Sequence, residues 1–346
     1  MSNPDYNILF ALITSFLVTY VAIPKVIFFA QQFRLTDLAG ERASHSGRTP
    51  IFGGIAIFSG ILFSLLFWAE LEEIQFLITS FLIVFFVGVI DDLLNLTPFK
   101  KLAGQIIAIL VVIYLGEIQI DSMHGVLGVY DLPDFFATLF TVFVVIVITN
   151  GFNLIDGVDG LAAGVGVIAA LCFGFIAVMM GQSDMAIIAF SLAGALLAFL
   201  RYNFNPAKIF MGDTGSLVVG MILSVLAINT IRYGLVTEDF RFPNKGPLMA
   251  IVFLAVPLFD TLRVFVVRAS KRKGPLRAGR DHIHHALLDL GFGHKTTTLM
   301  LYFMSIALII GTYFILELNV NLSIAILAFV SYLLLIFPFY LLRRKK

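Results

Sequence analysis

Long apolar runs separated by short polar segments make up almost the whole chain. A membrane-crossing helix needs about 20 mostly apolar residues, and runs near this length recur along the sequence. The pattern predicts an all-α polytopic membrane protein with about eleven transmembrane helices. We expect the helices at 6–30, 51–69, 76–92, 102–120, 135–152, 161–180, 185–202, 216–233, 247–268, 297–316 and 321–342.

One polar connection has the composition of a β-hairpin. It spans 121–134 and combines turn glycines with the strand-forming residues Val126, Val129 and Tyr130. The other connections are too short to build a core of their own. We therefore expect a single integral membrane domain over residues 1–346.

Basic residues concentrate in alternate connections, whereas acidic residues dominate the connections between them. Cytosolic loops of membrane proteins are enriched in Lys and Arg. This distribution predicts an external N-terminus, an external hairpin and a cytosolic C-terminus, which ends Arg343, Arg344, Lys345 and Lys346.

The composition supports the membrane assignment. Of the 346 residues, 60% are hydrophobic and 13% are charged, and the mean hydropathy of +0.99 is far above that of a soluble domain. The net charge of +1 gives no reason to expect a nucleic-acid partner. The only cysteine, Cys172, excludes an intramolecular disulfide and a thiolate zinc cluster.

The polar sequences that are hardest to explain structurally all fall on the expected cytosolic side. The segment N-F-N-P-A-K-I-F-M-G-D-T-G-S-L, at 203–217, places Asp213 between Gly212 and Gly215 at the start of an apolar run. Such a loop suits a phosphate held together with a metal ion. It equally suits a connector whose Asp213 caps the next helix.

Several carboxylates fall at this same membrane surface, although a charge at membrane depth costs about 2.5–3.5 kcal/mol. Asp91 and Asp92 could solvate a helix end. If all the acids converge, their repulsion requires a cation, and oxygen ligands favour Mg²⁺ or Mn²⁺. The acids concerned are Asp91, Asp92, Asp156, Asp159 and Asp213.

The segment R-D-H-I-H-H contains His282, His284 and His285. Closely spaced histidines occur in zinc sites, but the basic residues around these three, including Arg280, favour binding of phosphate oxygens. Asp260 and Arg263, three residues apart, are expected to form an intrahelical ion pair with a structural role.

A metal, phosphate donors and a wall of membrane helices suggest that a soluble phosphorylated donor meets a lipid acceptor in a phosphoryl transfer. An ion-coupled transporter is the alternative from another class, but its acids should lie mid-span, whereas these lie at span ends and in loops. A membrane scaffold would leave the acids and histidines unexplained.

Five motifs together resemble the polyprenyl-phosphate N-acetylhexosamine-1-phosphate transferase family, glycosyltransferase family 4, and in particular its bacterial UDP-GlcNAc:undecaprenyl-phosphate GlcNAc-1-phosphate transferases. The motifs are H-S-G-R-T-P-I-F-G-G, G-V-I-D-D, N-G-F-N-L-I-D-G-V-D-G-L, N-P-A-K-I-F-M-G-D-T-G-S and R-D-H-I-H-H. The resemblance implies an active site built from the cytosolic loops 31–50, 91–101, 150–160, 203–216 and 269–296.

The resemblance also implies roles for individual residues. Asp213 and Asn153 would contribute to a magnesium site, and Asp91 and Asp92 would lie near the acceptor phosphate as the catalytic pair. The other assignments are Lys101, Arg280, His282, His284 and His285 for the donor pyrophosphate; Phe210, Asp156 and Asp159 for the nucleoside; and His45 and Arg48 for the acceptor or the support of its loop. From its position alone, Phe210 could also be an interfacial anchor.

The implied reaction transfers a sugar 1-phosphate, GlcNAc-1-phosphate by preference, from a UDP-sugar to undecaprenyl phosphate. It releases UMP and initiates synthesis of a cell-surface glycan such as lipopolysaccharide, O-antigen or teichoic acid. The alternatives are phospho-MurNAc-pentapeptide and other UDP-N-acetylamino sugars. The resemblance further implies a bacterial inner-membrane enzyme with a cytosolic active site, and it is compatible with a homodimer. Direct transfer is the preferred mechanism, and a covalent aspartyl intermediate is the alternative.

Overall fold

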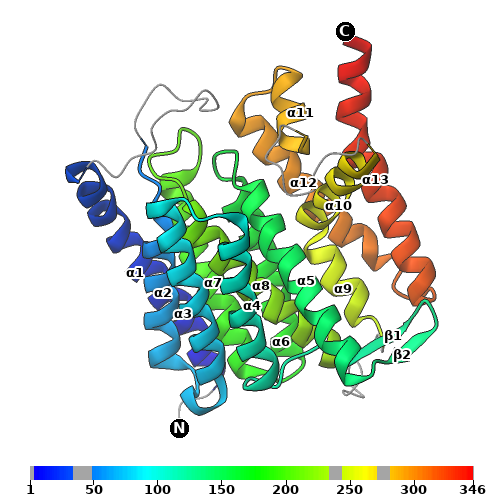
Figure 1. Ribbon diagram of the computed structural model, residues 1–346, viewed down its shortest axis with the longest axis horizontal. Coiled ribbons are helices and arrows are strands. Elements are labelled where there is room, and N and C mark those ends of the chain that lie inside the picture. The colour runs from blue at the N-terminus through cyan, green and yellow to red at the C-terminus, as the bar shows by residue number, and fades with distance from the viewer. Residues whose placement is uncertain (1–3, 34–48, 234–243, 271–280, 346) are drawn as a thin grey trace.

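The structure is a computed structural model that describes residues 4–33, 49–233, 244–270 and 281–345. Within these residues the chain forms a helical bundle with one two-stranded sheet (Figure 1). The first elements are α1 (Pro4–Gln32), α2 (Gly53–Trp68), α3 (Leu71–Leu94), α4 (Pro98–Tyr114), β1 (Ser122–Val126), β2 (Val129–Asp131) and α5 (Asp134–Ile155). The others are α6 (Leu161–Met179), α7 (Ser183–Asn203), α8 (Gly212–Tyr233), α9 (Gly246–Phe253), α10 (Ala255–Ser270), α11 (Ile283–Asp289), α12 (His294–Tyr313) and α13 (Val320–Lys345).

The helices confirm a multi-pass membrane architecture. In the described part of the chain, eight helices are long and apolar enough to cross a membrane, or nine if the bent pair α9–α10 counts as one span. The count of about eleven spans is not reached by this criterion, in part because α2 is apolar but has only 16 residues. Figure 1 shows the two chain ends at opposite ends of the bundle.

The expected hairpin is present. Strands β1 and β2 pair antiparallel, with Val126 opposite Val129, and the two residues between them, Leu127 and Gly128, both have positive φ, at 53° and 78°. Positive φ at both central positions gives the tight turn whose twist matches paired strands. Asn321 of α13 binds the hairpin by accepting from the Leu127 N–H at 2.6 Å and donating to the Gly125 carbonyl at 3.0 Å.

Helix α8 is the central element, and 94% of the residues in its most apolar stretch are buried. It packs against α2, α3, α5, α6, α7 and α9. Two glycines allow neighbouring helices to approach its N-terminus. A Cβ on Gly54 of α2 would lie 2.2 Å from the Gly215 nitrogen, and a Cβ on Gly88 of α3 would lie 2.4 Å from the Thr214 Cα. This contact brings the C-terminal end of α3 beside the first turn of α8.

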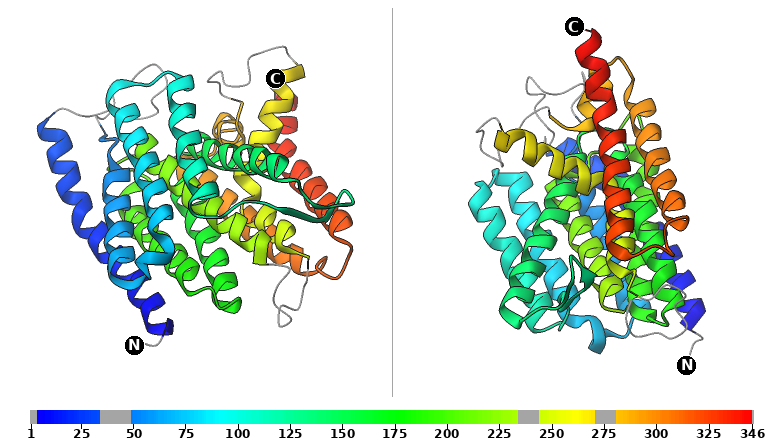
Figure 2. Two further views of the ribbon diagram at one scale, coloured as in Figure 1. Left: turned by 60° about the horizontal axis from the view of Figure 1, so that its bottom comes forward. Right: turned by 90° about the vertical axis from the view of Figure 1, so that its right-hand side faces the viewer.

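A sharp break separates α9 from α10, whose axes differ by 80°. Pro257 lies in the first turn of α10, where its missing N–H removes no helical hydrogen bond. In Figure 2, α10 consequently runs across the bundle and not along it. The sequence pattern at 247–268 predicted one continuous span, because a bend does not interrupt the apolar run.

Candidate active site

The N-terminus of α8 is capped by a carboxylate from another helix. Asp92, near the C-terminal end of α3, accepts hydrogen bonds from the Asp213 N–H at 2.8 Å, the Thr214 N–H at 2.9 Å and the Thr214 hydroxyl at 2.5 Å. These N–H groups have no acceptor within their own helix. The first turn of α8 thus has its capping side chain in Asp92.

Asp213 takes part in a separate cluster. The Lys101 Nζ lies 2.8 Å from Asp213 Oδ1 and 3.0 Å from Asp91 Oδ2, so one ammonium group bridges two carboxylates. The Asn153 amide donates to the same Asp213 oxygen and, at 2.9 Å, to the Ser216 hydroxyl. Helices α3, α4, α5 and α8 each supply one member of this cluster of Asp91, Lys101, Asn153 and Asp213.

The cluster fits a hard divalent cation that is bound partly by substrate. In the described ranges no group of three or more His, Cys, Asp or Glu side chains is arranged to hold a metal by itself. Magnesium sites commonly use one or two protein oxygens, with phosphates and water completing the shell. The Asp213 side chain is 30% exposed, against 7% for Asp91, which makes Asp213 the accessible carboxylate. The Asn153 amide lies beside it as a second oxygen donor, because exchange of its amide oxygen and nitrogen needs only rotation of the side chain.

Asp156 follows the C-terminal end of α5 and lies in the electrostatic field of the same acids. Burial, followed by the charges of Asp213, Asp92 and Asp159, raises the pKa of Asp156 well above its usual range. Contacts in the structure bring together three of the predicted carboxylates, because Asp91 and Asp213 both contact Lys101 and Asp92 accepts from the Asp213 N–H.

Asp159 connects three segments of the chain. Its Oδ2 accepts from the Asn205 amide at 2.9 Å and the Ala207 N–H at 3.0 Å, and its carbonyl accepts from the Thr298 hydroxyl of α12 at 2.9 Å. The segment that it holds continues to Phe210, whose N–H donates to the Pro50 carbonyl at 2.8 Å. Asp159 and Phe210 therefore flank one loop, and their roles at a nucleoside remain predictions.

The three histidines form a row beside this loop. The rings of His282 and His284 are parallel, with centroids 5.6 Å apart, and the centroids of His284 and His285 are 4.2 Å apart. A Cβ on Gly157 would lie 3.0 Å from His284 Nε2, so the row reaches the segment that contains Asp156 and Asp159. Burial, with a smaller contribution from His285, lowers the pKa of His284 to about 3. His284 is therefore neutral at physiological pH.

Some predicted residues lie outside the described part of the chain, namely His45, Arg48 and Arg280. Two residues that the sequence analysis did not assign to the site lie within it. Asn203 accepts from the Gly160 N–H and donates to the Ile209 carbonyl, both at 2.9 Å, which fixes the loop before α8. Asp260 makes the expected pair with Arg263, at 3.1 Å, and also contacts His282. The sequence signals for Asp260 were its position within an apolar run and its spacing from Arg263, and neither indicated the contact with His282.

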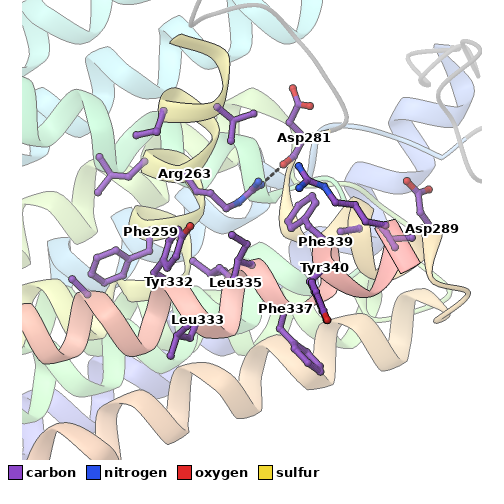
Figure 3. A pocket seen from close by; sticks show the side chains of 18 residues that line it. Phe259, Arg263, Asp281, Asp289, Tyr332, Leu333, Leu335, Phe337, Phe339 and Tyr340 are labelled. Atoms are coloured by element: carbon purple, nitrogen blue, oxygen red, sulfur yellow. Dashed lines mark hydrogen bonds between the residues drawn. The ribbon is translucent and has the colours of Figure 1, made fainter. Parts of the chain in front are cut away.

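A cavity of about 1300 Å³ lies between α10, α11 and α13. Its wall is mainly apolar, and Arg263 reaches from α10 to the Asp281 carbonyl on one side of it (Figure 3). The α11 residues in the wall are Ala286 and Asp289, whereas the three histidines are not among its lining residues.

The fold and the site define a class: a multi-pass membrane enzyme whose acidic and basic groups converge where several helices end, as phosphoryl transfer at a membrane surface requires. The chain matches glycosyl transferase family 4 over residues 74–231. It is 32% identical over 336 residues to the probable undecaprenyl-phosphate N-acetylglucosaminyl 1-phosphate transferase of Bacillus subtilis, covering 96% of this chain and 90% of that protein.

Two further relatives have names of the same kind. The decaprenyl-phosphate N-acetylglucosaminephosphotransferase of Mycolicibacterium smegmatis is 32% identical over 317 residues, which cover 84% of this chain and 77% of that protein. The undecaprenyl-phosphate alpha-N-acetylglucosaminyl 1-phosphate transferase of Escherichia coli K12 is 27% identical over 290 residues, with coverages of 81% and 76%. The chain belongs to glycosyl transferase family 4 and is a phosphotransferase. Membership of this family implies metal-dependent transfer.

Proposed function

We propose that the protein transfers GlcNAc 1-phosphate from UDP-GlcNAc to a polyprenyl phosphate and releases UMP. The names of the Bacillus and Mycolicibacterium relatives support the sugar and the class of acceptor. The observation that carries the proposal is the meeting of Asp91, Lys101, Asn153 and Asp213 beside the capped N-terminus of α8.

The reaction is a displacement at phosphorus. An oxygen of the acceptor phosphate attacks the β-phosphorus of the donor, and the bond from that phosphorus to the bridging oxygen breaks. UMP leaves with the bridging oxygen, and the lipid carries a diphosphate-linked sugar. Mg²⁺, or Mn²⁺ in its place, held by Asp213 and Asn153 would neutralise the charge that develops on UMP.

The chain's own residues divide the remaining tasks. Lys101, which already bridges two carboxylates, has the charge and the position to donate to the donor pyrophosphate. Asp91 is assigned to the acceptor side. A phosphate monoester is already largely anionic at pH 7, so Asp91 serves mainly to orient the acceptor. Asp92 keeps Asp213 in place through the first turn of α8.

The donor's two ends are assigned to different segments. Phe210 would stack on uracil, with Asp156 and Asp159 close to the nucleoside. The row of His282, His284 and His285 would bind the pyrophosphate together with Arg280. The support is that Asp159 holds the loop leading to Phe210, while His284 lies against Gly157, so both segments border one region.

We further propose eleven membrane crossings, with α2, α4 and the bent pair α9–α10 added to the long helices. The N-terminus would be outside and the site in the cytosol, where UDP-sugars are made. The alternation of basic and acidic connections supports this orientation in a bacterial inner membrane. A homodimer through helix faces completes the proposed assembly.

The decisive experiment incubates purified protein with Mg²⁺, undecaprenyl or decaprenyl phosphate, and a panel of UDP-sugars that includes UDP-MurNAc-pentapeptide, and measures UMP release. The expected result is acceptor-dependent UMP release that is fastest with UDP-GlcNAc. A preference for the pentapeptide donor would replace the proposed substrate. Release of no UMP from any donor would refute the enzyme proposal.

A further inference from the structure

Asp260 is a fully buried carboxylate in α10 that the proposed reaction leaves without a role. Its Oδ2 lies 2.8 Å from His282 Nδ1, and its Oδ1 accepts from the Ile283 N–H at 3.0 Å and from Arg263 Nη2 at 3.1 Å. An acid that only paired with Arg263 on its own helix would need neither of the other two contacts. Asp260 therefore joins α10 to the first residues of the histidine segment.

Of the two ring nitrogens of His282, Nδ1 contacts Asp260, whereas Nε2 has no hydrogen-bond partner in the described part of the chain. Its side chain is 4% exposed, and its Nε2 is buried with no hydrogen-bond partner among the residues that the structure describes. A buried polar atom without a partner is uncommon and marks a place where a ligand or a bound water is expected. Because a carboxylate lies at Nδ1, the proton of that nitrogen is held there, and Nε2 is the atom left for a ligand.

We infer that Asp260 is a positioning residue for donor binding: it fixes the ring of His282 so that Nε2 faces the pyrophosphate of the donor. This inference rests on the proposed function. As a phosphate approaches Nε2, Asp260 stabilises the doubly protonated ring, whose Nδ1–H donates to the carboxylate and whose Nε2–H donates to a phosphate oxygen. Asp260 acts through His282 and does not touch the substrate.

The orientation of the other histidine rings also depends on Asp260. His282 precedes α11, and its ring lies parallel to that of His284, which in turn contacts Gly157 beside Asp156. A rotation of the His282 ring would disturb this stacking. Asp260 thus links the bent helix α10 to the loop after α5 through two imidazole rings.

Arg263 balances the buried charge of Asp260. Its guanidinium donates to Asp260 and to the Asp281 carbonyl and lies 4.0 Å from the centroid of the Phe339 ring of α13. A buried carboxylate is tolerated when it is paired and hydrogen-bonded on all sides. Asp260 therefore has a fixed charge state and a fixed position.

Asp260→Asn tests the inference with little change of shape. The amide oxygen can still accept from Ile283 and Arg263, while the amide NH₂ meets His282 Nδ1 and donates to it. This exchange leaves a neutral ring that can still donate from Nε2–H, but it removes the carboxylate that stabilises the cationic ring, so the contact with phosphate loses its charge-assisted strength. Loss of the carboxylate that orients a metal-bound histidine typically costs about 10- to 100-fold in metal affinity or activity. We expect a loss of this size in kcat/KM, expressed mainly as a higher KM for UDP-GlcNAc, with the KM for polyprenyl phosphate unchanged.

The full experiment is a double-mutant cycle of Asp260→Asn and His282→Gln, with Thr261→Val as the matched control. Thr261 is a buried neighbour on α10 whose hydroxyl has no partner in the described ranges, so its loss should leave the kinetics unchanged. If Asp260 acts through His282, the double variant is no slower than His282→Gln alone.

Two results would overturn the inference. One is near-normal kinetics of Asp260→Asn while the wild-type enzyme is active, which would leave the proposed function standing. The other is a double variant whose loss in kcat/KM equals the product of the two single losses, with equal changes in the KM for UDP-GlcNAc and the KM for polyprenyl phosphate. This result would mean that Asp260 has only a structural role. A wild-type protein that releases no UMP would instead refute the proposed function.

Discussion

Substitution of Asp92 should distinguish a carboxylate that caps the α8 N-terminus from one that takes part in the reaction. In Asp92→Ala, the N–H groups of Asp213 and Thr214 and the Thr214 hydroxyl all lose their acceptor. Thr214 is fully buried, so water cannot replace the lost partner without rearrangement. In Asp92→Asn, one side-chain oxygen remains, and Asn caps helices about as well as Asp.

The expected free-energy change follows from these contacts. Loss of a capping side chain costs about 0.5–2 kcal/mol, and leaving the buried Thr214 hydroxyl without an acceptor adds about 1–3 kcal/mol. We therefore expect Asp92→Ala to lower the free energy of unfolding by about 3 kcal/mol, equivalent to roughly 4 °C in Tm for a chain of 346 residues. The Asn variant should lose about 1 kcal/mol, because the hydrogen bonds are kept in part.

Activity should follow the same order. Asp213 begins the capped turn, and a displacement of about 1 Å at a reacting centre can cost about 100-fold in rate. Thermal melts in detergent and UMP release would be measured on the wild type, Asp92→Asn and Asp92→Ala. We expect the Asn variant to lie between the wild type and Asp92→Ala in both Tm and activity. Equal inactivity of both variants, with wild-type Tm values, would show that the carboxylate acts chemically.

Three further predictions concern the metal, the helix contact and the histidine row. Asp213→Ala should abolish UMP release at any practical Mg²⁺ concentration, and near-normal activity would mean that the metal is bound elsewhere. Gly88→Ala places a Cβ 2.4 Å from the Thr214 Cα, so it should destabilise the protein by about 1–3 kcal/mol and slow turnover. The control Gly311→Ala, whose Cβ would meet nothing within 4 Å, should do neither. Equal Tm values for the two variants would contradict the close contact of α3 with α8. The folded-state pKa of His284, about 3, lies below its unfolded value of 6.5, so stability should be lost as pH falls from 6.5 towards 3. The loss in free energy of unfolding is about 2 kcal/mol at pH 5. The Tm of the wild type should therefore fall further between pH 7.5 and pH 5 than the Tm of His284→Asn. Equal falls in Tm would refute the lowered pKa of His284.

The proposed division between Asp91 and Asp92 bears on the mechanism as well. Asp92 already accepts three hydrogen bonds, and Asp91 is paired with Lys101 and accepts from the Leu96 N–H at 2.6 Å. Carboxylates engaged in this way are better suited to orient groups than to form a covalent phosphate. We therefore expect that donor alone will release no UMP; capture of a phosphorylated enzyme before the acceptor is added would favour the two-step route.

The membrane class, the hairpin at 121–134 and the candidate residues could all be predicted from the sequence, because they depend on composition and short-range spacing. Apolar runs of membrane length require helices, and glycines at the turn permit positive φ. The acids near the α3 and α8 ends were visible as charges that an apolar environment would otherwise exclude. The bend between α9 and α10 was not visible, because Leu254 and Pro257 belong to an unbroken apolar run.

Which of these residues contact one another depends on the packing of the helices, which the sequence pattern does not show. The contact of Asp92 with the Asp213 N–H spans 121 positions of the chain, that of Lys101 with Asp213 spans 112, and that of Asp260 with His282 spans 22. The sequence pattern predicted that this helix begins at 216, whereas α8 begins at Gly212, and the pattern could not show that the cap of the helix comes from α3. That assignment depends on how closely α3 approaches α8, which Gly88 permits at a distance where any side chain would collide with Thr214.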